Sequence, residues 1–106
     1  MSSKDKRHSK GKIKVYLQTE KGEISDELDL HGYLVEEALA EIEHYLDKSY
    51  LYGLSRVRIV HGHGTGKLRK AIREYLPTHP HVKKFHSAEP HYGGDAITIV
   101  QLETLD

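Results

Sequence analysis

The chain has no cysteine among its 106 residues. Disulfide bonds and thiolate metal sites are therefore excluded, and a reducing, cytoplasmic setting is expected. Long hydrophobic runs are also missing, because no stretch reaches the roughly 20 apolar residues that a membrane-spanning helix needs. The first residues are basic and no apolar segment follows them, which is unlike a secretory signal. We expect one domain with a modest core and no membrane partner, since only 37% of the residues are hydrophobic.

Net charge is absent as well, with 16 basic and 16 acidic residues, but the charges are segregated along the chain. The net charge is +5 over residues 1–18 and −8 over 19–53, then +7 over 54–88 and −4 over 89–106. A local basic region attracts polyanions whatever the total charge is. The 54–88 segment is therefore a candidate nucleic-acid surface, although ordinary solvated faces would give the same pattern.

Glycine is concentrated between an apolar run that ends at Val60 and a helical pattern that begins at Leu68. Residues 61–67 have the sequence HGHGTGK, which predicts a tight loop between a strand and a helix. A helix N-terminus presents unpaired N–H groups, and glycines permit a ligand to approach closely, so this loop suits a phosphate. The spacing matches neither the P-loop nor the dinucleotide-binding fingerprint. A flexible turn with no ligand is the alternative interpretation.

The hydrophobic pattern predicts a β-α-β-α-β-β core, a two-layer α/β sandwich with a mixed sheet. A disordered basic arm or linker is expected over 1–11, and a short strand and polar loop over 12–25, with the polar loop beginning at Thr19 and reaching Asp26. The other expected elements are a strand at 28–30, a helix of about five turns from Leu34 to near Gly53, a strand at 56–60, a helix from 67 with a basic face, and strands at 82–88 and 96–102.

A short motif, an apolar residue followed by His and Gly, occurs twice: Leu30-His31-Gly32 precedes the first helix and Val60-His61-Gly62 precedes the second. Parallel strands joined by a helix end at the same edge of a sheet, where open α/β sheets bind ligands. Asp29 alternates with two leucines, so its side chain is expected beside His31 on the polar face. The sequence therefore predicts one cleft lined by Asp29, His31, His61, His63 and Lys67.

Phosphodiester cleavage needs a base, an acid and stabilisation of the charge that develops on the phosphate. Candidate catalytic residues are Asp29, His31, His61 and His63, with Asp29 able to orient a histidine, act as a base or bind a divalent cation such as Mg or Mn. The candidate nucleic-acid-binding residues are Gly62, Gly64, Thr65, Gly66, Lys67, Arg69, Lys70 and Arg73.

Two His-x-His pairs, at 61 and 63 and at 79 and 81, also raise the possibility of zinc. No third strong ligand follows at a typical spacing, so a structural zinc site is the less favoured interpretation. We expect His79 and His81 instead on solvated loops beside prolines.

Together, the Leu28–Gly32 segment, the Val57–Leu76 segment and Gly93-Gly94-Asp95 resemble the small MutS-related (Smr) domain over residues 26–103. The motif HGxGTGxLR is most similar to that of the C-terminal Smr domain of bacterial MutS homologues outside mismatch repair. The MutS-linked branch often has arginine where this chain has His31, and free-standing and RNA-acting members favour histidine.

This resemblance implies a fold similar to the C-terminal domain of translation initiation factor three, with residues 26–106 as a nicking endonuclease domain. It implies functional roles for Asp29, His31, His61 and the three loop glycines. It implies nicking of DNA or RNA, and we expect a DNA substrate chosen by structure more than by sequence. We also expect the domain to be part of a larger MutS-like ATPase that limits recombination. An RNA endonuclease, or a non-catalytic nucleic-acid- or ribosome-binding module, is the alternative.

Overall fold

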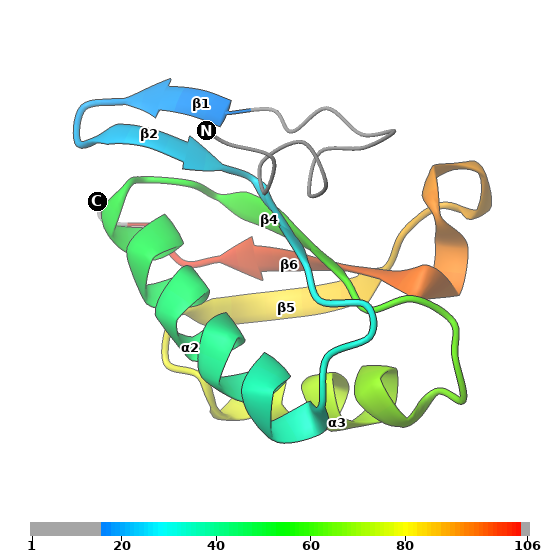
Figure 1. Cartoon of the computed structure of the whole chain (residues 1–106). Helices are drawn as coiled ribbons and strands as arrows, with labels where there is room; N and C mark the ends of the chain where they lie inside the picture. The colour runs from blue at the N-terminus through cyan, green and yellow to red at the C-terminus, as the bar shows by residue number, and fades with distance from the viewer. Residues whose placement is uncertain (1–15, 105–106) are drawn as a thin grey trace, which may run out of the picture.

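The computed structural model describes residues 16–104, which form a two-stranded hairpin, a four-stranded sheet and two α-helices (Figure 1). The elements in chain order are β1 (Tyr16–Thr19), β2 (Gly22–Ser25), β3 (Glu27–Asp29), α2 (Val35–Leu51), β4 (Arg56–Val60), α3 (Lys67–Tyr75), the 3-10 turn η1 (Leu76–Thr78), β5 (Val82–Ser87), the 3-10 turns η2 (Pro90–Tyr92) and η3 (Gly94–Ala96), and β6 (Ile97–Leu102).

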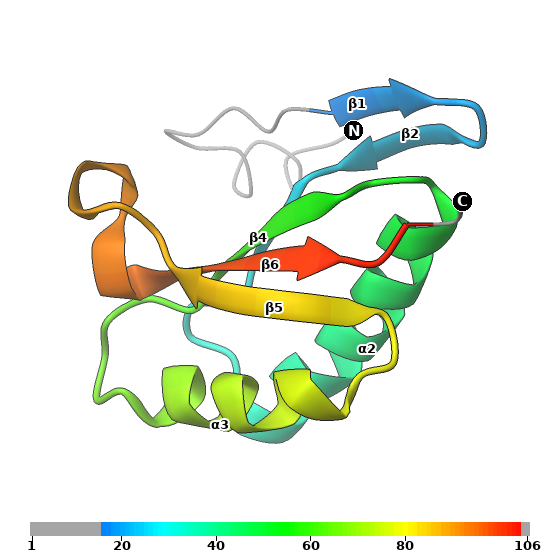
Figure 2. The same ribbon diagram turned by 180° about the vertical axis from the view of Figure 1, so that it is seen from behind.

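The four-stranded sheet has the order β3-β4-β6-β5. Helix α2 connects β3 to its parallel neighbour β4, and β6 then inserts antiparallel to both β4 and β5. Both helices cover the same face of the sheet (Figures 1 and 2). The predicted mixed sheet, two-layer arrangement and β-α-β-α-β-β order are therefore confirmed. The likeness to the C-terminal domain of translation initiation factor three stays a prediction.

Alternation along β4 and helical spacing along α2 build the core. Val57 and Ile59 of β4 are buried against the helices, whereas Val60 packs on the opposite face of the sheet with Ile97 and Ile99. Helix α2 buries residues at intervals of about four, which is one face of a helix with 3.6 residues per turn. Those residues are Ala38, Ile42, Leu46 and Ser49.

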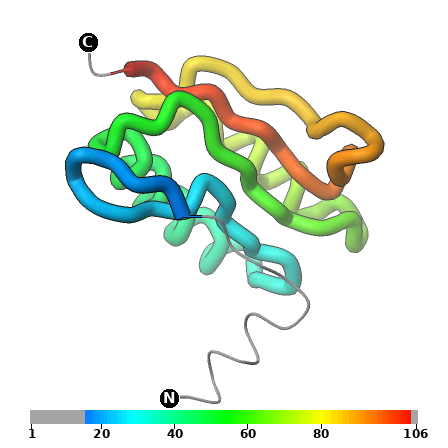
Figure 3. Tube along the Cα trace, turned by 90° about the horizontal axis from the view of Figure 1, so that it is seen from above, coloured from blue at the N-terminus to red at the C-terminus, as the bar shows by residue number. Residues whose placement is uncertain are grey.

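The hairpin corrects the loop predicted over Thr19–Asp26, because β2 occupies Gly22–Ser25 and pairs antiparallel with β1 (Figure 3). Ile24 explains the difference, since this single apolar residue of a polar stretch is buried in the main core. The Thr19 hydroxyl donates a hydrogen bond to the Gly22 carbonyl across the turn. The predicted basic arm, and most of the predicted first strand, lie outside the described residues.

Two further expectations about burial were wrong. Leu34, predicted on the apolar face of the first helix, is 70% exposed because it is the extended residue that precedes the first turn of α2. His79, predicted on a solvated loop, is buried at the far end of the helical layer. There its Nε2 lies 3.0 Å from Asp47 Oδ1, and its Nδ1 accepts a hydrogen bond from the backbone N–H of His81.

Candidate active site

The two His-Gly segments meet at one edge of the sheet. Parallel pairing places Asp29 opposite Val60, and the backbone N–H of Leu30 donates to the Val60 carbonyl at 2.7 Å. The predicted juxtaposition of the two segments is therefore confirmed. Its cause is the short α2 crossover, which returns the chain to the neighbouring strand in the same direction.

Asp29, the last residue of β3, and His31 form a close pair. His31 Nδ1 lies 2.7 Å from Asp29 Oδ1, and the same oxygen accepts the backbone N–H of His31 at 3.1 Å. The His31 side chain is 68% exposed and that of Asp29 is 17% exposed. The carboxylate is thus sheltered while it contacts Nδ1 of a largely exposed imidazole.

The glycine loop needs its glycines because of their backbone conformation. Gly62, Gly64 and Gly66 all have positive φ, at 78°, 43° and 85°, which side chains of L-residues rarely tolerate. At Gly62 a Cβ would also lie 3.4 Å from the His31 Cβ. That separation is an ordinary van der Waals contact, so the two segments lie side by side and the positive φ is what favours glycine here.

The α3 helix starts at the end of this loop. Gly66 precedes its first turn and offers no side-chain cap, while the Thr65 hydroxyl accepts the backbone N–H of Lys67 at 3.3 Å. Lys67 and Lys70 are exposed on the first turn. A helix start with cations beside it is favourable for an anion.

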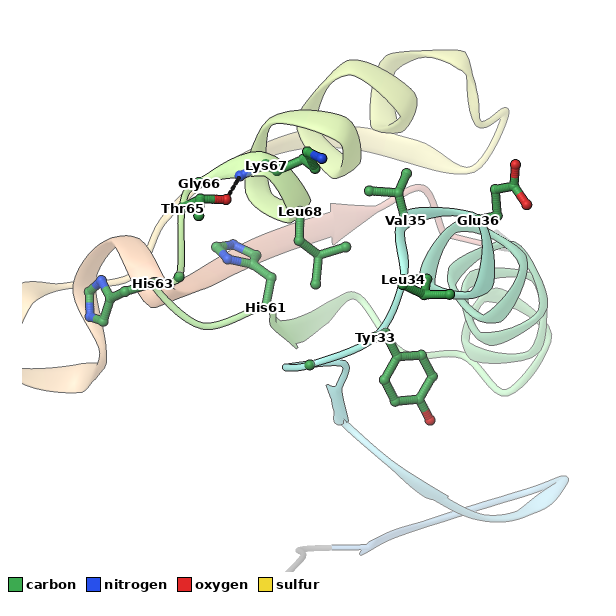
Figure 4. Close-up of a pocket in the computed structure, with 12 residues that line it drawn as sticks. Tyr33, Leu34, Val35, Glu36, His61, His63, Thr65, Gly66, Lys67 and Leu68 are labelled. Atoms are coloured by element: carbon green, nitrogen blue, oxygen red, sulfur yellow. Dashed lines mark hydrogen bonds between the residues drawn. The ribbon is translucent and has the colours of Figure 1, made fainter.

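A pocket of about 430 Å³ opens between the N-termini of α2 and α3 (Figure 4). The Leu68 side chain points toward Leu34 and Val35, whereas the ring of His63 points toward the 90–96 segment. The lining residues are Gly32, Tyr33, Leu34, Val35, Glu36, His61, His63, Gly64, Thr65, Gly66, Lys67 and Leu68.

The prediction of one shared cleft is therefore corrected. Asp29 and His31 do not line this pocket, and they adjoin it across Gly62. The physical reason is strand alternation: Asp29 pairs with Val60 on the sheet face away from the helices, whereas His61, one residue later, faces the helical side.

His61 is 4% exposed and both of its ring nitrogens have partners. Nδ1 lies 3.0 Å from its neighbour's carbonyl, Gly62 O, and Nε2 lies 2.8 Å from Thr98 Oγ1. Burial lowers the pKa of His61, the Gly62 carbonyl opposes this shift, and the nearby charges of Arg73 and Arg69 lower the pKa further.

Arg73 corrects the predicted exposed basic face, because its guanidinium turns inward toward the sheet. Its Nε donates to Thr98 Oγ1 at 3.0 Å and its Nη2 donates to Ser87 Oγ at 2.9 Å. The Ser87 hydroxyl donates in turn to Asp95 Oδ1 at 2.7 Å, and Arg69 lies 3.5 Å from the other carboxylate oxygen. The hydrogen bond from Ser87 lowers the pKa of Asp95, with Arg69 and Arg73 contributing.

Thr98, Ser87 and Asp95 are thus residues that sequence reasoning did not place in the site. Of these three residues, only Asp95 was indicated by the sequence, because it is the last residue of the Gly93-Gly94-Asp95 motif. Thr98 lies in an apolar strand where nothing in the local pattern distinguishes it.

The comparison with known proteins decides the family. Residues 28–103 match the Smr domain. This chain belongs to the Smr family. It is 54% identical over 80 residues to the Endonuclease MutS2 of Pelotomaculum thermopropionicum, an alignment that covers 76% of this chain and 10% of that protein. The chain therefore spans about a tenth of the length of the curated relatives it matches.

Solved Smr structures have the same fold. The Smr domain of Thermus thermophilus MutS2 superposes with a TM-score of 0.71 at 45% identity, covering 73% of this chain and 96% of that one. YdaL of Escherichia coli, a stand-alone small MutS-related protein, gives 0.69 at 27% identity, covering 74% and 65%. Smr domains thus occur both within larger proteins and alone.

The metal possibilities can be tested on this Smr domain's own residues. Over residues 16–104, no group of three His, Cys, Asp or Glu side chains is arranged to hold a metal ion. His61 uses both ring nitrogens within the fold, so the first His-x-His pair does not make a zinc site. For a divalent cation, the candidate carboxylate is Asp29, whose Oδ1 already contacts His31. Between residues 16 and 104, no helix has the length and apolarity to cross a membrane.

Proposed function

We propose that this Smr domain is an endonuclease domain that nicks phosphodiester bonds of DNA, with a preference for structure over sequence. The observation that carries the proposal is the exposed Asp29–His31 pair packed against Gly62 of the glycine loop. The name Endonuclease MutS2, borne by relatives such as that of Pelotomaculum thermopropionicum, supports it.

The geometry supports separate proposed roles for the glycine loop and for the Asp29–His31 pair. The loop amides and the exposed Lys67 and Lys70 hold the phosphate and stabilise charge on it. Asp29 holds His31 through Nδ1, so that Nε2 accepts a proton from the attacking water as the oxygen bonds to phosphorus. The bond to the leaving oxygen of the strand then breaks, and that oxygen takes up a proton, which His31 can return.

The direct test is nicking of supercoiled plasmid by D29N and H31A variants. Asn keeps the shape of Asp29 and removes its charge, so we expect a loss of about 100-fold or more while DNA affinity is retained. H44A is the matched control, because His44 is an exposed histidine on the outer face of α2. Parent-like nicking by both dyad variants would overturn the assignment.

A non-catalytic nucleic-acid-binding module is the second candidate, because the loop amides and the exposed Lys67 and Lys70 suit a phosphate without any proton transfer by the dyad. In that case K67A/K70A would abolish binding and no preparation would nick. Parallel assays on structured RNA test for an RNA endonuclease, and repeating each assay with and without EDTA tests for a requirement for Mg or Mn.

We further propose that the parent protein is a larger MutS-like ATPase.

A further inference from the structure

We infer that His61 is a positioning residue, held as the neutral Nδ1–H tautomer by Thr98 and Arg73, and that it fixes the glycine loop and performs no proton transfer. The sequence placed His61 among the catalytic candidates and Arg73 among the phosphate contacts. The contacts of both side chains support different roles.

The first step concerns Nδ1 of His61, which lies 3.0 Å from the Gly62 carbonyl oxygen. A carbonyl oxygen only accepts hydrogen bonds, so Nδ1 must carry the hydrogen. The bond holds the Gly62 carbonyl in place. The N–H of the same glycine donates to the Ala96 carbonyl at 3.0 Å, so Gly62 is held on both sides.

The second step concerns Nε2, which lies 2.8 Å from Thr98 Oγ1. Arg73 Nε also contacts this hydroxyl oxygen, and an arginine nitrogen can only donate. The lone pair that faces Arg73 is thereby used, and the hydroxyl hydrogen is free to point to Nε2. Because Thr98 is fully buried, water does not offer it another acceptor. Nε2 is therefore unprotonated.

The charges around His61 favour the same state. Burial disfavours an imidazolium most strongly, and Arg73 and Arg69 of α3 would also repel it. Asp95 of η3 would attract it, but its carboxylate contacts Ser87 and Arg69. In this environment both ring nitrogens of the histidine have partners, and the protonated form is disfavoured.

The outer part of this chain of contacts gives the Gly93-Gly94-Asp95 segment a role. Asp95 accepts the Ser87 hydroxyl, Ser87 accepts from Arg73, and the adjacent Ala96 carbonyl accepts the N–H groups of His61 and Gly62. The segment therefore sets the position of Gly62, against which His31 packs. In this way, these contacts set the distance between the Asp29–His31 pair and the glycine loop.

The tautomer is tested by nitrogen NMR of the histidine rings in the full ¹⁵N-labelled chain, between about pH 5.5 and 8, with free imidazole as reference. We expect His61 to show a protonated Nδ1 and an unprotonated Nε2 throughout this range. A protonated Nε2 in the neutral ring, or titration of His61 alongside free imidazole, would overturn the inference. This measurement needs no variant and does not depend on nuclease activity.

The functional consequence rests on the proposed nicking activity and uses a matched pair of variants. The side-chain amide nitrogen of H61N occupies the position of Nδ1, whereas that of H61Q occupies the position of Nε2. We expect H61N to keep nicking within a few-fold of the parent, with an unchanged pH profile. H61Q should lose about tenfold, the rate equivalent of one net hydrogen bond.

Thr98 supplies the second pair, since T98S keeps the hydroxyl and T98V removes it at equal size. T98V should lower nicking about tenfold and change the His61 nitrogen shifts, and T98S should do neither. If H61N instead loses as much activity as H31A, His61 transfers a proton and the inference is wrong. If no form of the protein nicks, the proposed function fails while the NMR result still decides the tautomer.

Discussion

Two Asp–His pairs lie at opposite ends of the helical layer and differ in which partner is sheltered. Asp29–His31, beside the glycine loop, has a 68% exposed histidine and a 17% exposed carboxylate. Asp47–His79, at the far end, has a 2% exposed histidine and a 52% exposed carboxylate. The separations between nitrogen and oxygen are similar, 2.7 and 3.0 Å.

The difference fits the proposed catalytic role of the first pair and a structural role of the second. His79 uses Nε2 toward Asp47 and Nδ1 toward the backbone N–H of His81, and the ring of Tyr75 covers it edge-on. His81 itself stacks on Tyr50 at 3.7 Å. A histidine with both nitrogens used can hold a chain segment in place but cannot exchange protons with a substrate. His31, by contrast, is largely exposed and contacts Asp29 through Nδ1.

The largest expected effect comes from removing each histidine in turn. H31A should reduce nicking by about 100-fold or more and leave thermal unfolding nearly unchanged, because the side chain is exposed. H79A should do the reverse. It leaves the buried N–H of His81 without its acceptor, so we expect about 2 kcal/mol lower unfolding free energy with nearly normal nicking.

Nicking assays and denaturant unfolding on the same two preparations measure this contrast. A strong loss of nicking in folded H79A, with H31A active, would reverse the assignment of the two pairs.

A smaller effect is expected from two glycines in open space. Gly64 in the phosphate loop and Gly53 after α2 both have positive φ, 43° and 88°, and a Cβ at either would meet nothing within 4 Å. G64V and G53V should each lower stability by about 1–2 kcal/mol through backbone strain. Only G64V should also weaken DNA binding, as titration by fluorescence anisotropy would show. Equal DNA affinity for the two folded variants would remove the loop from the binding site.

DNA affinity should depend moderately on salt concentration, because few lysines of α3 neutralise phosphates. Arg73 is committed to Thr98 and Ser87, and Arg69 lies beside Asp95, so Lys67 and Lys70 are the cations of α3 left for phosphate. Two contacts predict a slope of about −2 for log affinity against log salt, in place of the −3 to −4 that four contacts would give. K67A/K70A should flatten this slope, and K83A/K84A on β5 should not. A slope near −4 would mean that both arginines leave their partners on binding.

The smallest effect concerns pH and the second buried histidine, His61. Its pKa is lowered in the folded state by burial and by Arg73 and Arg69. The unfolded chain therefore gains a proton first on acidification, so stability is full above about pH 6.5 and declines below it toward the folded pKa. Each pKa unit of lowering corresponds to about 1.4 kcal/mol. Unfolding free energies of the parent and H61N across this window should differ in slope, and parallel curves would contradict the shift.

Local patterns in the sequence determined most of the fold. The period of α2, the β-branched run of β4 and the glycines of the loop predicted their elements to within one or two residues, because each depends on neighbours in the chain. The Asp29–His31 contact was predictable for the same reason, since strand alternation places residues two apart on one side. The second hairpin strand was not, because only the burial of Ile24 distinguishes it from a polar loop.

Tertiary structure decided the environment of each side chain. Arg73 looks like a surface cation in the helical pattern, and it turns inward because Thr98 and Ser87 arrive from strands 25 and 14 residues away. His61 and His63 belong to one motif, yet one is buried with both nitrogens used and the other is exposed. Hydrogen-bond partners and burial come from segments distant in the chain, so a histidine's protonation state and its capacity for chemistry follow from packing.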